Sequence, residues 1–141
     1  MCIRDSSYGT DRASLTQAVL EGVAFSMRDC LDALATSGTH IDIADVIGGG
    51  SRSRTWIAII ASALNIPLRR LAAGENGGAF GAARLARMAV TGESPTSVCT
   101  PPAREETIMP DPRLVDAYAR RIERYRALHA AGGSSLDALD P

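Results

Sequence analysis

The stretch DVIGGGSRSRTW, residues 45–56, decides how this sequence is interpreted. It begins at the end of a segment over 41–47 that alternates and then runs apolar, which is typical of a strand. Three glycines follow, and residues 53–65 then have helical spacing, with Ser51 or Ser53 able to cap the first turn. A glycine-rich turn between a strand and a helix is typical of nucleotide-binding loops. The backbone can approach a phosphate closely there, and the helix N-terminus offers free amide donors.

The segments on either side of this loop alternate between helical and strand patterns. The sequence predicts a helix over 12–35, a strand over 66–72, a helix over 79–92 and a helix over 111–130. The first of these helices carries two adjacent apolar stripes, so we expect neighbours to cover most of its circumference. Residues 93–110 hold four of the seven prolines and are expected to form an irregular crossing segment.

This order of elements predicts a fold class. Strands that alternate with helices favour an α/β architecture with some parallel pairing. Two expected strands are too few for an ordinary sheet, so the chain is interpreted as part of a larger fold.

The composition excludes several classes of function. The 141 residues carry a net charge of −1, with 45% apolar and 22% charged residues, so the chain can bury a core and we expect no nucleic-acid or membrane partner. The start lacks the pattern of a signal peptide, so a cytoplasmic location is expected. The three widely spaced cysteines predict neither a zinc site nor a disulfide framework. All 15 basic residues are arginine; without lysine the chain cannot by itself complete a P-loop, a Schiff-base site or a protein-kinase site.

One interpretation of the loop is a dinucleotide-binding turn of the Rossmann type. Gly48, Gly50 and Ser53 fill the G-x-G-x-x-G pattern with serine in the last place. The acidic residue expected about 20 residues later is missing. Arg69 and Arg70 stand there instead and suit a 2′-phosphate, so this alternative is an NADP-binding fragment.

A second interpretation is the nucleophile elbow of a hydrolase. Gly49, Ser51 and Ser53 fill G-x-S-x-G with the last glycine replaced, and Asp116 and His129 follow in the order of an α/β-hydrolase triad. The motif is degenerate, and His129 lies in a helical segment that is expected only to pack.

Four stretches in order resemble the C-terminal lobe of the FGGY family of carbohydrate kinases, most closely its xylulokinases. RASLTQAVLEGVAFSMRD at 12–29 resembles the R-A-x-L-x-R-A-V-L-E-G helix of the family, and VIGGGSRSRTW at 46–56 resembles its adenosine loop. GGAFGAARLA at 77–86 is similar to a second glycine turn and helix, and PDPRLVDAYARRIERYRALH at 110–129 is similar to the closing helix. The resemblance covers residues 9–130.

The resemblance implies an actin-like (ribonuclease H-like) ATPase fold with two lobes and ATP in the cleft between them. It places Gly49 beside the ribose and α-phosphate, with Gly48 and Gly50 shaping the turn. Ser53 takes the place of a polar residue on the adenine side, although it can also serve only as a helix cap.

The same resemblance assigns the second glycine turn and the missing parts of the site. Gly77 and Gly78 open this turn, and Gly81 is expected to let its helix pack closely against the first loop. The catalytic aspartate, the phosphate-binding D-x-G-T hairpin and the sugar pocket belong to the upstream lobe. Asp42 and Asp45 do not lie in the base motif, so we expect no catalytic residue and no metal ligand here, with Mg²⁺ held mainly by the nucleotide and the absent lobe.

The expected function is therefore ATP-dependent phosphorylation of a sugar hydroxyl, with D-xylulose the favoured substrate. This chain would supply part of the nucleotide-binding lobe and be inactive alone. A stand-alone, non-catalytic nucleotide-binding or interaction module is the alternative from a different class. Residues 1–8 are expected to be a non-native or disordered start, 9–130 the lobe fragment and 131–141 a flexible tail. The full-length protein would bind its sugar through the missing lobe, and a homodimer is possible.

Overall fold

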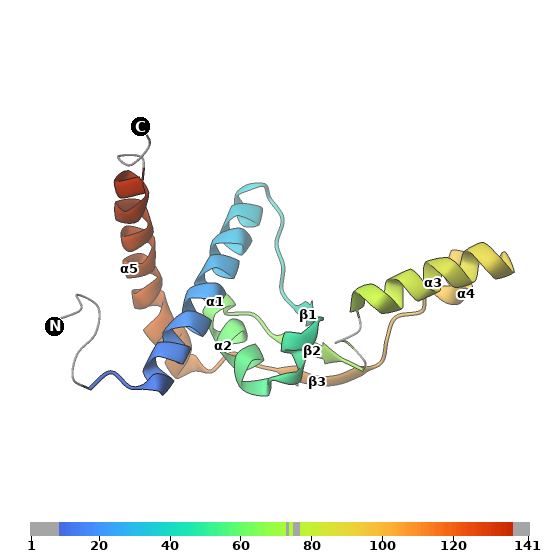
Figure 1. Ribbon diagram of the computed structural model, residues 1–141, viewed down its shortest axis with the longest axis horizontal. Helices are drawn as coiled ribbons and strands as arrows, with labels where there is room; N and C mark the ends of the chain where they lie inside the picture. The colour runs from blue at the N-terminus through green and yellow to red at the C-terminus, as the bar shows by residue number, and fades with distance from the viewer. Residues whose placement is uncertain (1–8, 73, 75–76, 137–141) are drawn as a thin grey trace.

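The computed structural model describes residues 9–72, 74 and 77–136, and its elements alternate between helices and strands (Figure 1). The expected non-native start at 1–8 and the last five residues of the expected tail lie outside the described residues. The elements in chain order are α1 (Arg12–Thr36), β1 (Ala44–Val46), the 3₁₀ turn η1 (Gly49–Arg52), α2 (Arg54–Leu64), β2 (Leu68–Leu71), α3 (Gly77–Thr91), α4 (Pro95–Val98), β3 (Arg104–Ile108) and α5 (Pro112–Leu136).

Three strands form one sheet in the order β1-β2-β3. β1 pairs with β2 in parallel, with Ala44 opposite Leu68, and β2 pairs with β3 antiparallel, with Leu68 opposite Ile108. The α/β prediction with parallel pairing is confirmed. The expectation of only two strands is wrong, because β3 lies inside the segment that was expected to be irregular.

The sequence pattern does not predict β3, because the residues of this strand, REETI, are mostly charged. Ile108 is its only buried residue, as suits a charged strand at the edge of a sheet. Its partner strand supplies the stabilising contacts: Arg70 Nε lies 3.1 Å from Glu105 Oε2 and Arg70 Nη2 lies 3.9 Å from Glu106 Oε2. Such a strand depends on cross-strand pairs rather than on an apolar pattern of its own.

α2 lies at the centre of the hydrophobic core. Ile57, Ile60 and Ala61 of this helix are buried, and they pack with residues from α1, α5 and the sheet. Phe25 of α1 meets Tyr118 of α5 edge to face, with ring centroids 5.4 Å apart. The core therefore fixes α2, and with it the loop from which α2 begins.

α1 begins where the sequence predicts, because Asp11 accepts a hydrogen bond from the Ser14 amide at 2.7 Å. Ala24 and Phe25 are buried, but members of both apolar stripes are exposed, as Val19 at 67% and Val23 at 44% show. The expectation that neighbours would cover most of this helix is therefore wrong for the described chain. Helices α2 and α5 cover only one side of it (Figure 1).

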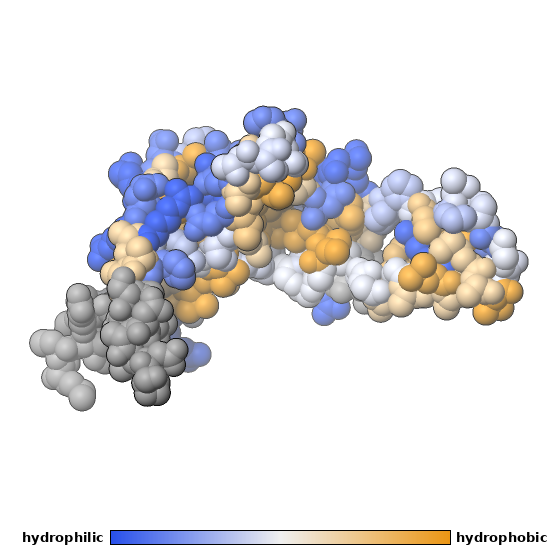
Figure 2. Space-filling model, turned by 90° about the horizontal axis from the view of Figure 1, so that it is seen from above, coloured by the Kyte–Doolittle hydropathy of each residue, from blue (hydrophilic) through white to orange (hydrophobic). Residues whose placement is uncertain are grey.

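α3 and α4 form an arm that extends away from the rest of the molecule (Figure 1). None of the residues of α3 is buried, and Figure 2 shows apolar side chains on the surface of this arm. Leu85 and Val90 are 66% and 86% exposed. Gly81 was expected to pack against the first glycine loop, but no described atom lies within 4 Å of a Cβ built there. That expectation is wrong because the helix leaves the loop within its first turn.

Two further findings concern the length of α5 and the apolar character of the helices. α5 continues through Leu136, so the first residues of the expected tail are helical. Within the described ranges, no helix is both long enough and apolar enough to span a bilayer.

Candidate functional site

The two glycine turns lie at the same edge of the sheet. β1 and β2 are parallel neighbours, so the loops that follow them leave the sheet at the same end. The Gly48 amide donates a hydrogen bond to the Gly74 carbonyl at 2.9 Å, which joins the two turns directly. A Cβ at Gly77 would lie 3.2 Å from Ile47 Cδ1. The structure thus brings together the two turns that the sequence analysis had singled out.

The three glycines of the first turn differ in whether, and why, the fold needs a glycine. Gly48 has φ +88° and ψ 177°, a conformation that is open essentially only to glycine. A Cβ at Gly50 would lie 3.1 Å from both Cδ1 and Nε1 of the Trp56 indole. At Gly49, by contrast, φ is outside the left-handed region and no described atom lies within 4 Å of a Cβ. The fold itself therefore gives no reason for glycine at this position, and it leaves space beside the backbone.

The second turn shows the same contrast. A Cβ at Gly74 would lie 3.2 Å from the Val46 carbonyl oxygen, and Gly77 is crowded by Ile47. Gly78, in the first turn of α3, has no described atom within 4 Å of a built Cβ. Gly49 and Gly78 are thus positions where the missing side chain leaves open space and φ does not require glycine, whereas Gly48 also has open space but needs glycine for its φ.

Ser53 is the N-cap of α2. Its Oγ accepts a hydrogen bond from the Trp56 amide at 3.2 Å, as expected for a serine at the start of a helix. The cap function is confirmed, and the adenine-side role of Ser53 stays a prediction. Ser51 is 2% exposed, whereas the nucleophile of a hydrolase elbow must have an exposed hydroxyl, so the geometry disfavours that alternative.

The arginines beside the turns are paired with carboxylates. Arg69 Nε contacts Asp45 Oδ1 at 2.5 Å across β1 and β2, and Arg54 Nε contacts Glu106 Oε1 at 2.9 Å. Arg70 pairs with β3, as described above. Arg69 and Arg70 are the side chains that the NADP interpretation assigned to a 2′-phosphate, and here they hold the sheet together.

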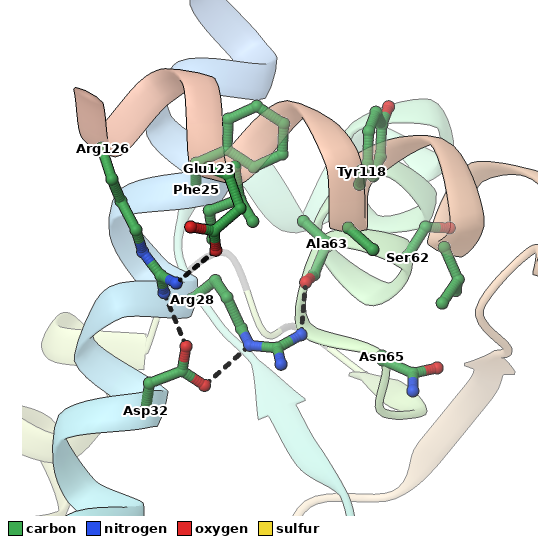
Figure 3. Close-up of a pocket in the computed structure, with 12 residues that line it drawn as sticks. Phe25, Arg28, Asp32, Ser62, Ala63, Asn65, Tyr118, Glu123 and Arg126 are labelled. Atoms are coloured by element: carbon green, nitrogen blue, oxygen red, sulfur yellow. Dashed lines mark hydrogen bonds and ion pairs between the residues drawn. The ribbon is translucent and has the colours of Figure 1, made fainter. Parts of the chain in front are cut away.

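A cavity of about 250 Å³ lies between α1, α2 and α5, and no residue of either glycine turn lines it (Figure 3). Arg126 of α5 contacts Asp32 of α1 at 2.7 Å; Asp32 accepts from Arg28 at 2.8 Å; and Arg28 donates to the Ala63 carbonyl at the end of α2 at 3.1 Å. Desolvation raises the pKa of Asp32, but the hydrogen bonds from Arg28 and Arg126 outweigh it and hold that pKa below its ordinary value. These charged groups pair with one another, so the residues that line the cavity form a network that holds α1, α2 and α5 together.

Glu21 had no assignable role in the sequence, although it lies in the L-E-G motif. Its carboxylate is buried and accepts hydrogen bonds from Arg121 Nη1 at 2.7 and 2.8 Å and from Gln17 Nε2 at 2.8 Å. This pair joins α1 to α5 across 100 residues of sequence. Burial, with the charge of Glu21 nearby, also raises the pKa of Tyr118 to about 12.

A family model described as the C-terminal domain of the FGGY family of carbohydrate kinases matches residues 1–90. The chain belongs to this family. It is 34% identical over 116 residues to the xylulose kinase of Escherichia coli strain K12, covering 82% of this chain and 24% of that protein. It is 33% identical over 124 residues to the L-xylulose/3-keto-L-gulonate kinase of the same strain, covering 85% of this chain and 24% of that protein.

Solved structures give the same assignment. A crystal structure described as a xyloylose kinase from Brucella ovis superimposes with a TM-score of 0.77 at 49% identity, over 96% of this chain and 27% of that one. The chain thus spans about a quarter of the length of the relatives that it matches. The predicted fold, the C-terminal part of an actin-like ATPase, is confirmed, and the family match favours a kinase over the Rossmann-type, hydrolase and stand-alone alternatives.

Among the described residues, no group of three or more His, Cys, Asp or Glu side chains is arranged to hold a metal ion. Cys30 and Cys99 are free and exposed.

Proposed function

We propose that this chain supplies part of the nucleotide-binding lobe of an ATP-dependent carbohydrate kinase. The observation that carries this proposal is the meeting of the two glycine turns, joined by the hydrogen bond from the Gly48 amide to the Gly74 carbonyl. Each turn has one glycine, Gly49 or Gly78, that has open space beside it and whose φ lies outside the left-handed region. A ribose or a phosphate can approach the backbone most closely at such positions.

Within this proposal the residues of the turns have separate roles. Gly49 lies beside the ribose and α-phosphate, and Gly48 and Gly50 give the loop its shape. Ser53 faces the adenine side in addition to capping α2, and Gly77 and Gly78 form the wall opposite. The amides at the start of α3 offer donors and a partial positive charge to a phosphate. The residues therefore fit a nucleotide, and the arginines nearby are already paired.

The remaining parts of the reaction lie outside the chain. Mg²⁺, which neutralises the charge on the transferred phosphoryl group, would be held mainly by the nucleotide and by the upstream lobe. The aspartate base and the sugar pocket would also lie upstream, so this chain carries no catalytic residue and is inactive alone. D-xylulose is the favoured sugar because several relatives are named as xylulose kinases. A cytoplasmic location belongs to the same proposal.

Calorimetry on the 141-residue chain tests the nucleotide site. We expect weak binding of ATP and ADP, no preference for NADP, and no ADP release in a coupled assay with ATP, Mg²⁺ and D-xylulose. Tighter binding of NADP than of ATP would favour the dinucleotide alternative. Phosphorylation of the sugar by this chain alone would show that the base lies within it, and absence of nucleotide binding would contradict the site.

The genomic DNA around the start codon tests the fragment interpretation separately. We expect the reading frame to continue upstream into a D-x-G-T hairpin and an aspartate base motif. A stop codon and a ribosome-binding site directly before Met1 would instead favour the stand-alone module.

A further inference from the structure

The indole of Trp56 lies against the first glycine turn. The space that a Cβ at Gly50 would need is limited by Trp56 Cδ1 and Nε1, each 3.1 Å away. Trp56 is half-buried and also packs against the hydrophobic core around α2. Trp56 therefore connects the core to the loop.

The loop is fastened to α2 at two points of the same residue. The Trp56 amide donates to Ser53 Oγ at 3.2 Å, and the Trp56 side chain contacts Gly50. Backbone hydrogen bonds from Ser51 to Gly48 at 3.0 Å and from Ser53 to Gly50 at 3.1 Å complete the 3₁₀ turn. Gly49 lies within this turn, and no described atom lies within 4 Å of a Cβ built there.

We propose that Trp56 is a positioning residue of the nucleotide loop. Its indole holds the Gly50 peptide in place and so fixes the backbone of Gly49, where the ligand approaches. Binding energy is lost when a loop must be ordered as the ligand binds, so a loop held in advance by a rigid aromatic side chain binds more tightly. This inference rests on the proposed nucleotide site for its ligand, but the claim about the loop holds without one.

The contact makes Gly50 and Trp56 dependent on each other. An added methyl group at Gly50 requires the indole to move by a few tenths of an ångström, because 3.1 Å is tighter than most real Cβ contacts. If the indole is removed, the same methyl group meets open space. Gly50→Ala should therefore disturb the loop in the parent chain and have little further effect when Trp56 is alanine, which is a coupling that a double-mutant cycle measures.

The experiment compares the 141-residue parent with Trp56→Phe, Trp56→Ala, Gly50→Ala and the double variant. Amide hydrogen exchange and chemical shifts of residues 48–51 are measured without ligand, and the ATP dissociation constant is measured by calorimetry. We expect Trp56→Ala to speed exchange at these amides and weaken ATP binding by about tenfold, or 1.4 kcal/mol. Trp56→Phe should keep the amide exchange rates and the ATP affinity close to those of the parent. Gly50→Ala should weaken ATP binding only when Trp56 is present.

Unchanged amides in Trp56→Ala, or equal effects of Gly50→Ala in both backgrounds, would overturn the positioning role. If the parent itself fails to bind ATP, the proposed function fails, and the amide comparison still decides the claim about Trp56. If Trp56→Ala does not fold by circular dichroism, Gly50→Ala decides: parent-like amides at residues 48–51 in that variant would overturn the role.

Discussion

Replacing Gly49 with valine separates a glycine needed by a ligand from a glycine needed by the fold. No described atom lies within 4 Å of a Cβ at Gly49, and its φ is outside the left-handed region. Valine can therefore adopt this backbone, although its branched side chain occupies the space proposed for the ribose and α-phosphate. Gly48→Val is the matched control, because the conformation at Gly48 is essentially restricted to glycine.

The expected magnitudes differ in kind. A substitution away from packed, capped or strained positions changes the free energy of unfolding by about 0.5 kcal/mol or less, which is our expectation for Gly49→Val. Forcing a side chain into the backbone conformation of Gly48 costs about 1–3 kcal/mol. Although Gly49→Val should hardly change stability, it should weaken ATP binding at least about tenfold, or 1.4 kcal/mol, with helicity unchanged.

Urea unfolding followed by circular dichroism gives the stabilities, and calorimetry gives the ATP affinities. The reasoning is refuted if Gly49→Val binds ATP as tightly as the parent, because the open space at Gly49 would then not be the ligand site. A loss of stability in Gly49→Val as large as that in Gly48→Val would refute the distinction between the two glycines.

Three further predictions concern the helices and the cap. Arg121→Ala removes the ion-pair partner of the Glu21 carboxylate, whose side chain is 10% exposed, although Gln17 still donates to it. Because Arg121 itself is 53% exposed, the free energy of unfolding should fall by about 2 kcal/mol in urea titrations, and an unchanged midpoint would contradict this. Tyr118 has its pKa raised from 10 to about 12, so the folded state keeps a proton that the unfolded state loses, and stability should fall as pH rises from 10 to 12. Tyr118→Phe should flatten that fall in pH-dependent melts, and equal slopes would contradict it. Ser53→Ala should cost about 1 kcal/mol of stability whereas Ser53→Asp keeps the cap. If Ser53 also faces adenine, both variants weaken ATP binding in calorimetry, and full binding by Ser53→Asp would limit Ser53 to its cap.

Local patterns were enough to predict most helices and the place of the site. The helical spacing over 53–65 and the residues before it predicted α2 and a serine cap at Ser51 or Ser53, because capping and periodicity are local properties; the structure has the cap at Ser53. β3 could not be predicted in this way. Its stability comes from Arg70 and the edge of β2, which lie more than 30 residues away in sequence.

The sequence indicated which glycines belong to the candidate site, but not why each position holds glycine. The sequence indicated Gly48, Gly49 and Gly50 as a group, and it could not show that one is needed for its φ, one for the indole of Trp56 and one for neither. These reasons depend on backbone angles and on a side chain six residues from Gly50, so only coordinates reveal them. Arg69 was misassigned for a similar reason, because its partner Asp45 lies on the neighbouring strand.

Glu21, the glutamate of the L-E-G motif, joins two of the helices that pack behind the first glycine turn. The glycine loop is held by the start of α2, and the end of α2 is held by Arg28, which donates to the Ala63 carbonyl. Arg28 lies on α1, and α1 is fixed to α5 by the pair of Glu21 and Arg121. The Glu21 side chain is only 10% exposed, so a loss of Arg121 leaves its charge poorly solvated, and the helices must shift to let water reach it. A motif with no chemical role of its own thus keeps the helix behind the loop in place, and the geometry of the site depends on it.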